Sequence, residues 1–112
     1  MTIYNNTTLD LIFHALSDKT RRKMLATISH QKSCTAGELA NLFETAQPTI
    51  SKHLKVLDKA GLVMRKIKGR HHYFELEPDA LIEADEWINR HLEFWGSSLD
   101  RLDEFLNESN KK

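Results

Sequence analysis

The side chains best suited to specific chemistry lie between residues 47 and 55, at the spacing of one exposed helix face. Gln47, Thr49 and Ser51 can donate and accept hydrogen bonds, and Lys52 and Lys55 carry positive charges. Amide and hydroxyl groups of this kind bind base edges in the major groove of DNA, and lysines bind phosphates. The alternative is a solvated basic face, which many surface helices carry. The neighbouring elements must distinguish the two.

An amphipathic helix would position these side chains. Ile50, Leu54 and Leu57 recur at i, i+4 and i+7, which predicts a buried stripe opposite the lysines. The residues around this stripe fit the two ends of a helix. Thr45 can cap its start, Pro48 is tolerated in its first turn, and Gly61 can end it. The helix therefore packs on its apolar face and exposes its polar one.

A second short helix precedes the first, and a hairpin follows it. Thr35 and Glu38 form the T-x-x-E capping-box pattern, which predicts a helix to Phe43 with Leu39, Leu42 and Phe43 as its apolar set. Residues 35–60 thus predict a helix-turn-helix. Residues 62–76 predict a β-hairpin with its tip at Lys68-Gly69. We interpret this hairpin as a wing that contacts DNA phosphates through Lys68 and Arg70; the alternative is an ordinary surface hairpin.

Apolar helices are predicted on both sides of this unit, over residues 8–16 and 78–106. Ser17 is the expected N-cap of a helix between the first of these and the helix-turn-helix. The last helix, ~28 residues and ~42 Å long, has more apolar surface than the small body can cover. We therefore predict a symmetric homodimer. Its interface is expected to contain apolar side chains from both flanking helices: Leu9, Ile12, Phe13, Ile88, Leu92, Trp95, Leu99 and Leu102.

The length of 112 residues predicts a single domain over residues 1–112, mainly α-helical with a small β-hairpin. The formal net charge is zero, but it is unevenly distributed. Residues 45–74 contain seven Lys and Arg against one Asp, whereas residues 75–108 contain eleven Asp and Glu against two Arg. The basic segment favours a polyanionic partner such as double-stranded DNA. We expect a cytoplasmic protein without a membrane segment, because the chain has no long apolar run and one cysteine.

Several polar residues allow two interpretations. Cys34 precedes a helix N-terminus, where the helix dipole lowers a thiol pKa, so it is a candidate redox sensor or otherwise an ordinary loop residue. His53, on the flank of the basic helix, could bind a phosphate or pack in the turn. Arg21 and Arg22 could contact phosphates or form a structural ion pair.

An enzyme is not expected. The sequence has no nucleophile–base pair, no phosphate-binding loop and no carboxylate cluster in a cleft-forming context. The alternative to DNA binding is a winged helix that serves as a protein-interaction module through its acidic C-terminal helix. The basic segment argues against that alternative, because such a module has no need for it.

Three segments carry a family resemblance: ALSDKTRRKML, ELANLFETAQPTISKHLKVLDKAGLV and KGRHHYFEL. Together they resemble the ArsR/SmtB family of bacterial winged-helix repressors over roughly residues 9–95. The resemblance implies a dimeric transcriptional repressor. It also implies binding to an inverted repeat near the promoter of its own operon, and release of that DNA on a signal.

The metal ligands of this family are not matched. Arsenic-sensing members carry a Cys-x-Cys pair where this chain has Thr35 and Gly37. Zinc-sensing members carry Asp-x-His in the last helix, where this chain has Asp85-Glu86-Trp87, and only His91 and Glu93 lie nearby. The chain is similar to the family branch without these ligands. We therefore expect no metal, no cofactor, and a non-metal or unknown inducer.

Overall fold

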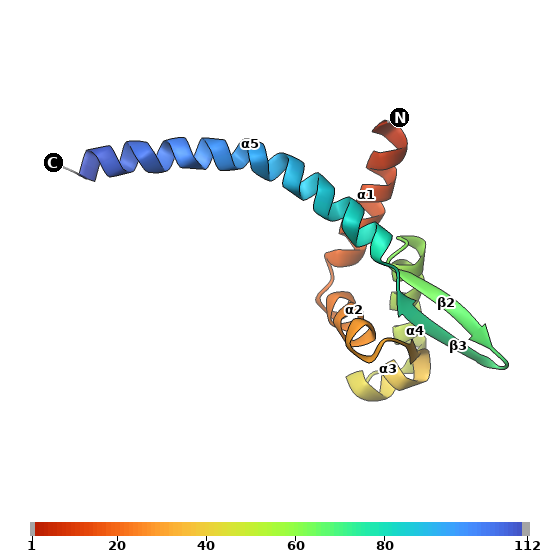
Figure 1. Cartoon of the computed structure of the whole chain (residues 1–112). Helices are drawn as coiled ribbons and strands as arrows, with labels where there is room; N and C mark the ends of the chain where they lie inside the picture. The colour runs from red at the N-terminus through yellow and green to blue at the C-terminus, as the bar shows by residue number, and fades with distance from the viewer. Residues whose placement is uncertain (1, 111–112) are drawn as a thin grey trace.

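The computed structural model describes residues 2–110, and the side chains of residues 8–92 and 101–107. Five helices and three short strands follow one another (Figure 1): α1 (Thr2–Leu16), α2 (Lys19–Gln31), β1 (Cys34–Thr35), α3 (Ala36–Phe43), α4 (Gln47–Lys59), β2 (Val63–Lys68), β3 (His71–Leu76) and α5 (Pro78–Asn110). The predicted class, mainly α with a β-hairpin in a winged helix-turn-helix, is confirmed.

The first two helices differ from the prediction at their starts. Helix α1 begins at Thr2 instead of residue 8, because once a helical turn exists each further residue adds a hydrogen bond even without an apolar pattern. The N-cap of α2 is Asp18 rather than Ser17. The Asp18 carboxylate accepts a hydrogen bond from the Arg21 amide at 2.9 Å. The Ser17 hydroxyl instead donates to the His14 carbonyl and thereby ends α1.

The capping box of α3 is present as predicted. The Glu38 amide donates to Thr35 Oγ1 at 3.1 Å, and the Thr35 amide donates to Glu38 Oε1 at 2.9 Å. At the other end of α3, Glu44 adopts a left-handed conformation with φ of 51° and so forms the tight turn into α4.

The start of α4 differs from the prediction. Its N-cap is Ala46, without a side-chain hydrogen bond, because the Thr45 hydroxyl donates backwards to the Phe43 carbonyl. Pro48 lies in the first turn as predicted. Gly61, with φ of +74°, follows the C-cap and ends the helix region as predicted.

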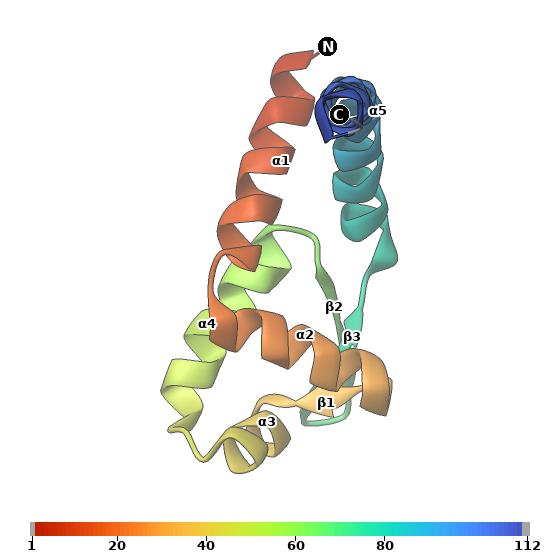
Figure 2. The ribbon, with the colours of Figure 1, turned by 90° about the vertical axis from the view of Figure 1, so that its left-hand side faces the viewer.

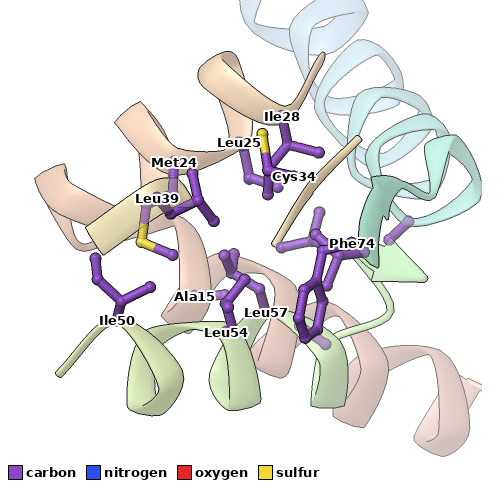
Figure 3. Close-up of a cluster of buried hydrophobic side chains, with 14 of the residues drawn as sticks. Ala15, Met24, Leu25, Ile28, Cys34, Leu39, Ile50, Leu54, Leu57 and Phe74 are labelled. Atoms are coloured by element: carbon purple, nitrogen blue, oxygen red, sulfur yellow. The ribbon is translucent and has the colours of Figure 1, made fainter. Parts of the chain in front are cut away.

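One hydrophobic core joins the helices to the sheet (Figure 3). Ile50, Leu54 and Leu57 of α4 are buried in it, which confirms the predicted stripe. In α3 the prediction was partly wrong. Leu39 and Ala40 are buried, whereas Leu42 is 55% exposed, because the helix turns Ala40 rather than Leu42 towards the body.

The sheet has three antiparallel strands in the order β1-β3-β2. The hairpin register pairs Val63 with Leu76 and Lys68 with His71, so its turn lies at Gly69-Arg70, one residue later than predicted. Strand β1 was not predicted: Cys34 was expected in a loop and Thr35 as a helix cap, because two residues carry no readable alternation. It forms by pairing with the wing, with Cys34 opposite Phe74.

Helix α5 follows the wing after a single residue. The amide of that residue, Glu77, donates to the Leu62 carbonyl at 2.9 Å and fixes the junction. At 1.5 Å per residue the 33 residues of α5 are ~50 Å long, so the helix extends far beyond the body (Figure 1). Its first turns lie beside α1 (Figure 2), where Phe13 and Trp87 make an edge-to-face contact with ring centroids 5.7 Å apart. No helix in the described part of the chain is long and apolar enough to cross a membrane.

Candidate nucleic-acid interface

Helix α4 exposes the polar face that its sequence predicts. Gln47, Thr49, Ser51, Lys52 and Lys55 are all exposed, while the opposite stripe is buried. The burial of this stripe fixes the rotation of the helix about its own axis. The polar side chains are therefore presented on a rigid support.

A groove of about 670 Å³ lies between this face and the wing. Gln47, Ser51 and Lys55 line it from α4, and Arg65 and Arg70 line it from the hairpin. Asp58 is the acidic residue in the lining, so cations outnumber anions there. The arrangement places hydrogen-bonding groups at one end and positive charge on both walls, which suits a phosphate-bearing ligand.

Arg65 was not predicted as a site residue, although the strand pattern contains a signal for it. Side chains two residues apart on a strand point to the same face, and Arg65 follows the buried Val63 by two. Its partner across the hairpin, Phe74, is also buried. Extending that face outward from Val63 places Arg65 on the α4 side of the wing.

Other predicted contacts lie outside the groove. Thr49 and Lys52 are exposed elsewhere on α4, and Lys68 lies 5.7 Å from the centre of the Tyr73 ring on the wing. Lys66 is committed to an ion pair with Glu75 at 3.1 Å, across the two strands. The wing therefore supplies Arg65 and Arg70 to the groove and Lys68 near its tip.

The arginines of α2 have a structural use, but not as an ion pair. Arg21 donates to the carbonyls of Ala15 and His14, and Arg22 donates to the carbonyl of Leu16. These are the last carbonyls of α1, which lack partners within their own helix. The third group that Arg21 contacts is His53, whose Nδ1 lies 3.3 Å from Arg21 Nη1.

Cys34 is a core residue, which contradicts the proposed redox role. The residue is completely buried, and its Sγ lies 3.4 Å from Gln31 Oε1. Burial raises the pKa of the thiol, and the nearby Glu38 carboxylate raises it further. The expected lowering of the pKa by the helix dipole is wrong, because desolvation outweighs it.

Two of the residues assigned to a dimer interface belong to the protomer core. Leu9 and Ile12 are buried within the protomer, and Ile12 belongs with Ala15 to the hydrophobic core cluster. The other four whose side chains are described remain on the surface: Phe13, Ile88, Leu92 and Leu102. The side chains of Trp95 and Leu99 lie outside the described residues.

The family's metal positions have other uses in this chain. Thr35 caps α3, and Gly37 lies beside Gln47. His91 stacks on Trp87 with ring centroids 4.1 Å apart, and its Nδ1 lies 2.8 Å from the Trp87 carbonyl. Among the side chains that the structure describes, no three His, Cys, Asp or Glu come together where they could hold a metal ion.

Comparison with known proteins identifies the family. A family described as a helix-turn-helix domain matches residues 16–66. The transcriptional repressor SdpR of Bacillus subtilis is 35% identical over 77 residues, which are 69% of this chain and 84% of that protein. A crystal structure of an ArsR family transcriptional regulator matches with a TM-score of 0.74 and 30% identity, covering 82% of this chain and 94% of that one. The chain belongs to the ArsR family.

Other ArsR relatives include metal-resistance regulators. An arsenic resistance transcriptional regulator of Pseudomonas putida is 34% identical over 79 residues, which are 70% of this chain but only 59% of that protein. Within the ArsR family, the geometry of α4 and the wing is that of a DNA-binding transcriptional regulator, and this is the function of the chain.

Proposed function

We propose that this ArsR-family regulator is a homodimeric repressor that binds an inverted repeat in double-stranded DNA near its own promoter. The observation that carries the proposal is the shared groove between α4 and the wing, with Lys55 on one wall and Arg65 and Arg70 on the other. A DNA backbone that follows the groove would neutralise cations on both sides. That explains why a protein without net charge has a local basic surface.

Within this proposal, Gln47, Thr49 and Ser51 contact base edges from the first turns of α4. A glutamine suits adenine, and hydroxyls accept several bases. Lys52 and Lys55 bind phosphates beside the major groove, and Lys68, Arg70 and Arg65 do so from the wing. His53 is assigned a supporting position on the flank of α4, because its Nδ1 already contacts Arg21.

The proposed dimer uses the surface that α1 and α5 leave uncovered. Leu92 and Leu102 of α5 are each 53% exposed, and Phe105 of the same helix is 64% exposed. Apolar surface of this extent is stable in water when a second copy covers it. Two copies related by a twofold axis would present two α4 helices to the two halves of an inverted repeat.

The inducer in this proposal is a non-metal or unknown one, because Thr35 and Gly37 replace the thiolates of the arsenic-sensing members of the family. Thiolate sites need several sulfurs, and Cys34 is the only cysteine in the sequence and is buried.

The cytoplasm is the proposed location, where operator DNA is accessible.

Fluorescence anisotropy tests this function directly. The purified protein is titrated against the DNA upstream of its own gene and against a random duplex, over a series of salt concentrations. A repressor binds the upstream DNA at least about a thousandfold more tightly, with an affinity that falls steeply with salt. Equal, weak binding to both duplexes would contradict the proposal.

A further inference from the structure

A hydrogen-bonded cluster lies where α1, α2 and α4 meet. Arg21 of α2 holds the carbonyls of His14 and Ala15 at 3.1 and 2.8 Å, and its Nη1 lies 3.3 Å from Nδ1 of His53. The Asp18 carboxylate in turn accepts the Arg21 amide. One half-buried guanidinium thus connects the end of α1 directly to the helix that faces DNA.

The chemistry of arginine fixes the state of the histidine. A guanidinium has five N–H donors and no acceptor. His53 Nδ1 must therefore accept the hydrogen bond, which requires a neutral ring with its proton on Nε2. A positively charged imidazole could not accept this bond.

The position of the pair gives it a role beyond stability. Helix α1 lies beside α5 (Figure 2), and the two helices carry the proposed dimer surface. His53 lies on α4 between Lys52 and Leu54, at the border of the exposed and buried faces. A rigid contact from α1 to this border limits how far α4 can move relative to the dimer axis.

We propose that Arg21 and His53 are positioning residues that hold α4 at a fixed distance from the dimer axis and so set the half-site spacing that the protein accepts. This inference rests on the proposed homodimeric repressor. Neither residue needs to touch DNA for this role, because both act through the placement of Gln47, Ser51 and Lys55.

Matched substitutions at residue 53 separate positioning from direct contact. His53→Asn keeps an acceptor at the place of Nδ1, because Oδ1 is the same number of bonds from the backbone. His53→Gln instead keeps a polar atom near the place of Nε2, and His53→Ala keeps neither. Arg21→Lys keeps the positive charge but loses the fork that holds three acceptors together.

The DNA measurement uses a duplex that the wild-type full-length protein selects from a random-sequence library, compared with the same duplex carrying one inserted base pair between its half-sites. We expect His53→Asn to keep the wild-type preference for native spacing. In His53→Ala, His53→Gln and Arg21→Lys the preference should fall about tenfold, the scale of one hydrogen bond to a charged group. The affinity of these variants for an isolated half-site should change by less than about twofold. A defect in stability would instead weaken binding equally to the selected duplex and to the duplex with the inserted base pair.

Two results would overturn the inference. The first is an unchanged spacing preference in His53→Ala, and the second is rescue by Gln but not by Asn, which would make His53 a DNA contact through Nε2. Nitrogen NMR of the histidine rings in the free full-length protein gives an answer independent of DNA. A proton on His53 Nδ1 would exclude the pair. If the wild-type protein selects no inverted repeat, the proposed function fails and the spacing role fails with it, while the NMR result still decides whether the pair exists.

Discussion

Helices α4 and α5 have the same apolar period, but their apolar stripes differ in how far the protomer buries them. In α4 the stripe of Ile50, Leu54 and Leu57 is buried by the protomer itself, and the opposite face is basic. In α5 the apolar side chains Leu92, Leu102, Phe105 and Leu106 are exposed, and the charged residues of the helix are mostly acidic. A 3.6-residue period therefore specifies which face of a helix is buried, but not which chain buries it.

The largest expected effect is in the core under α4. Leu57→Ala removes a fully buried side chain and leaves a cavity, so the free energy of unfolding should fall by ~2–5 kcal/mol. Leu102→Ala on α5 is the matched control, because this leucine is exposed in the protomer. Urea unfolding, followed by circular dichroism at low protein concentration, measures both. Equal losses would mean that the two stripes have the same cover within one protomer.

The next effect concerns the stripe on α5. Leu92→Asp should dissociate the dimer, because each copy loses ~1.5–3 kcal/mol of apolar burial and introduces a charge at the interface. Light scattering on a size-exclusion column should then give the mass of one chain, with unchanged helical content. Glu86→Gln, on an exposed position of the same helix, serves as the control. A Leu92→Asp protein that keeps the mass of two chains would exclude this surface as the interface.

A smaller effect separates two residues of the α4 polar face. Gln47→Ala should lower the preference for the selected operator over random DNA by ~1–3 kcal/mol, because a base contact is lost. Lys55→Ala should weaken binding to both duplexes and reduce the slope of log affinity against log salt by about 0.9, because one phosphate contact is lost. Anisotropy titrations at several salt concentrations measure both quantities. Identical changes in the two variants would show that the assigned roles are wrong.

The smallest expected effect is a pH dependence of stability that arises from Asp18, the N-cap of α2. The hydrogen bond from the Arg21 amide lowers the pKa of the Asp18 carboxyl from 3.8, against the opposing effect of burial, and the positive charge of Arg21 lowers it further. Because this pKa is lowered, the ionised Asp18 carboxylate stabilises the fold fully above about pH 3.8. This contribution is lost as the pH falls through the folded-state pKa. Asp18→Asn keeps the cap but not the charge. The difference in stability between Asp18→Asn and the wild type should therefore disappear in acid. Urea unfolding midpoints measured at intervals from about pH 2.5 to about pH 6 would detect this. A difference that stays constant with pH would contradict the assignment.

Local signals made much of the fold predictable. The capping box at Thr35 and Glu38, the stripe on α4 and the turn at Gly69 each depend on residues close in sequence, and each is present. Errors arose where a distant segment decides the outcome. Strand β1 exists because β3 lies beside it, and Ile12 is buried because the body covers that side of α1.

The candidate site divides in the same way. The polar row of α4 follows from helix geometry alone, so its exposure was predictable. The addition of Arg65 depends on how the hairpin docks against α4, and the contact between Arg21 and His53 joins residues 32 positions apart. Cys34 illustrates the opposite case, since its sequence context suggests reactivity while the core around it excludes solvent.

The one-residue junction between β3 and α5 has a mechanical consequence. Glu77 is tied to Leu62 through its backbone, and Pro78 begins the helix with a restricted backbone angle, so few torsions are free there. The wing and the ~50 Å helix are therefore joined rigidly at Glu77, so that a rotation of one element about this junction moves the other. A small tilt of α5 against a second copy would swing the hairpin tip across the DNA, so a signal that alters the dimer could change operator affinity without altering α4.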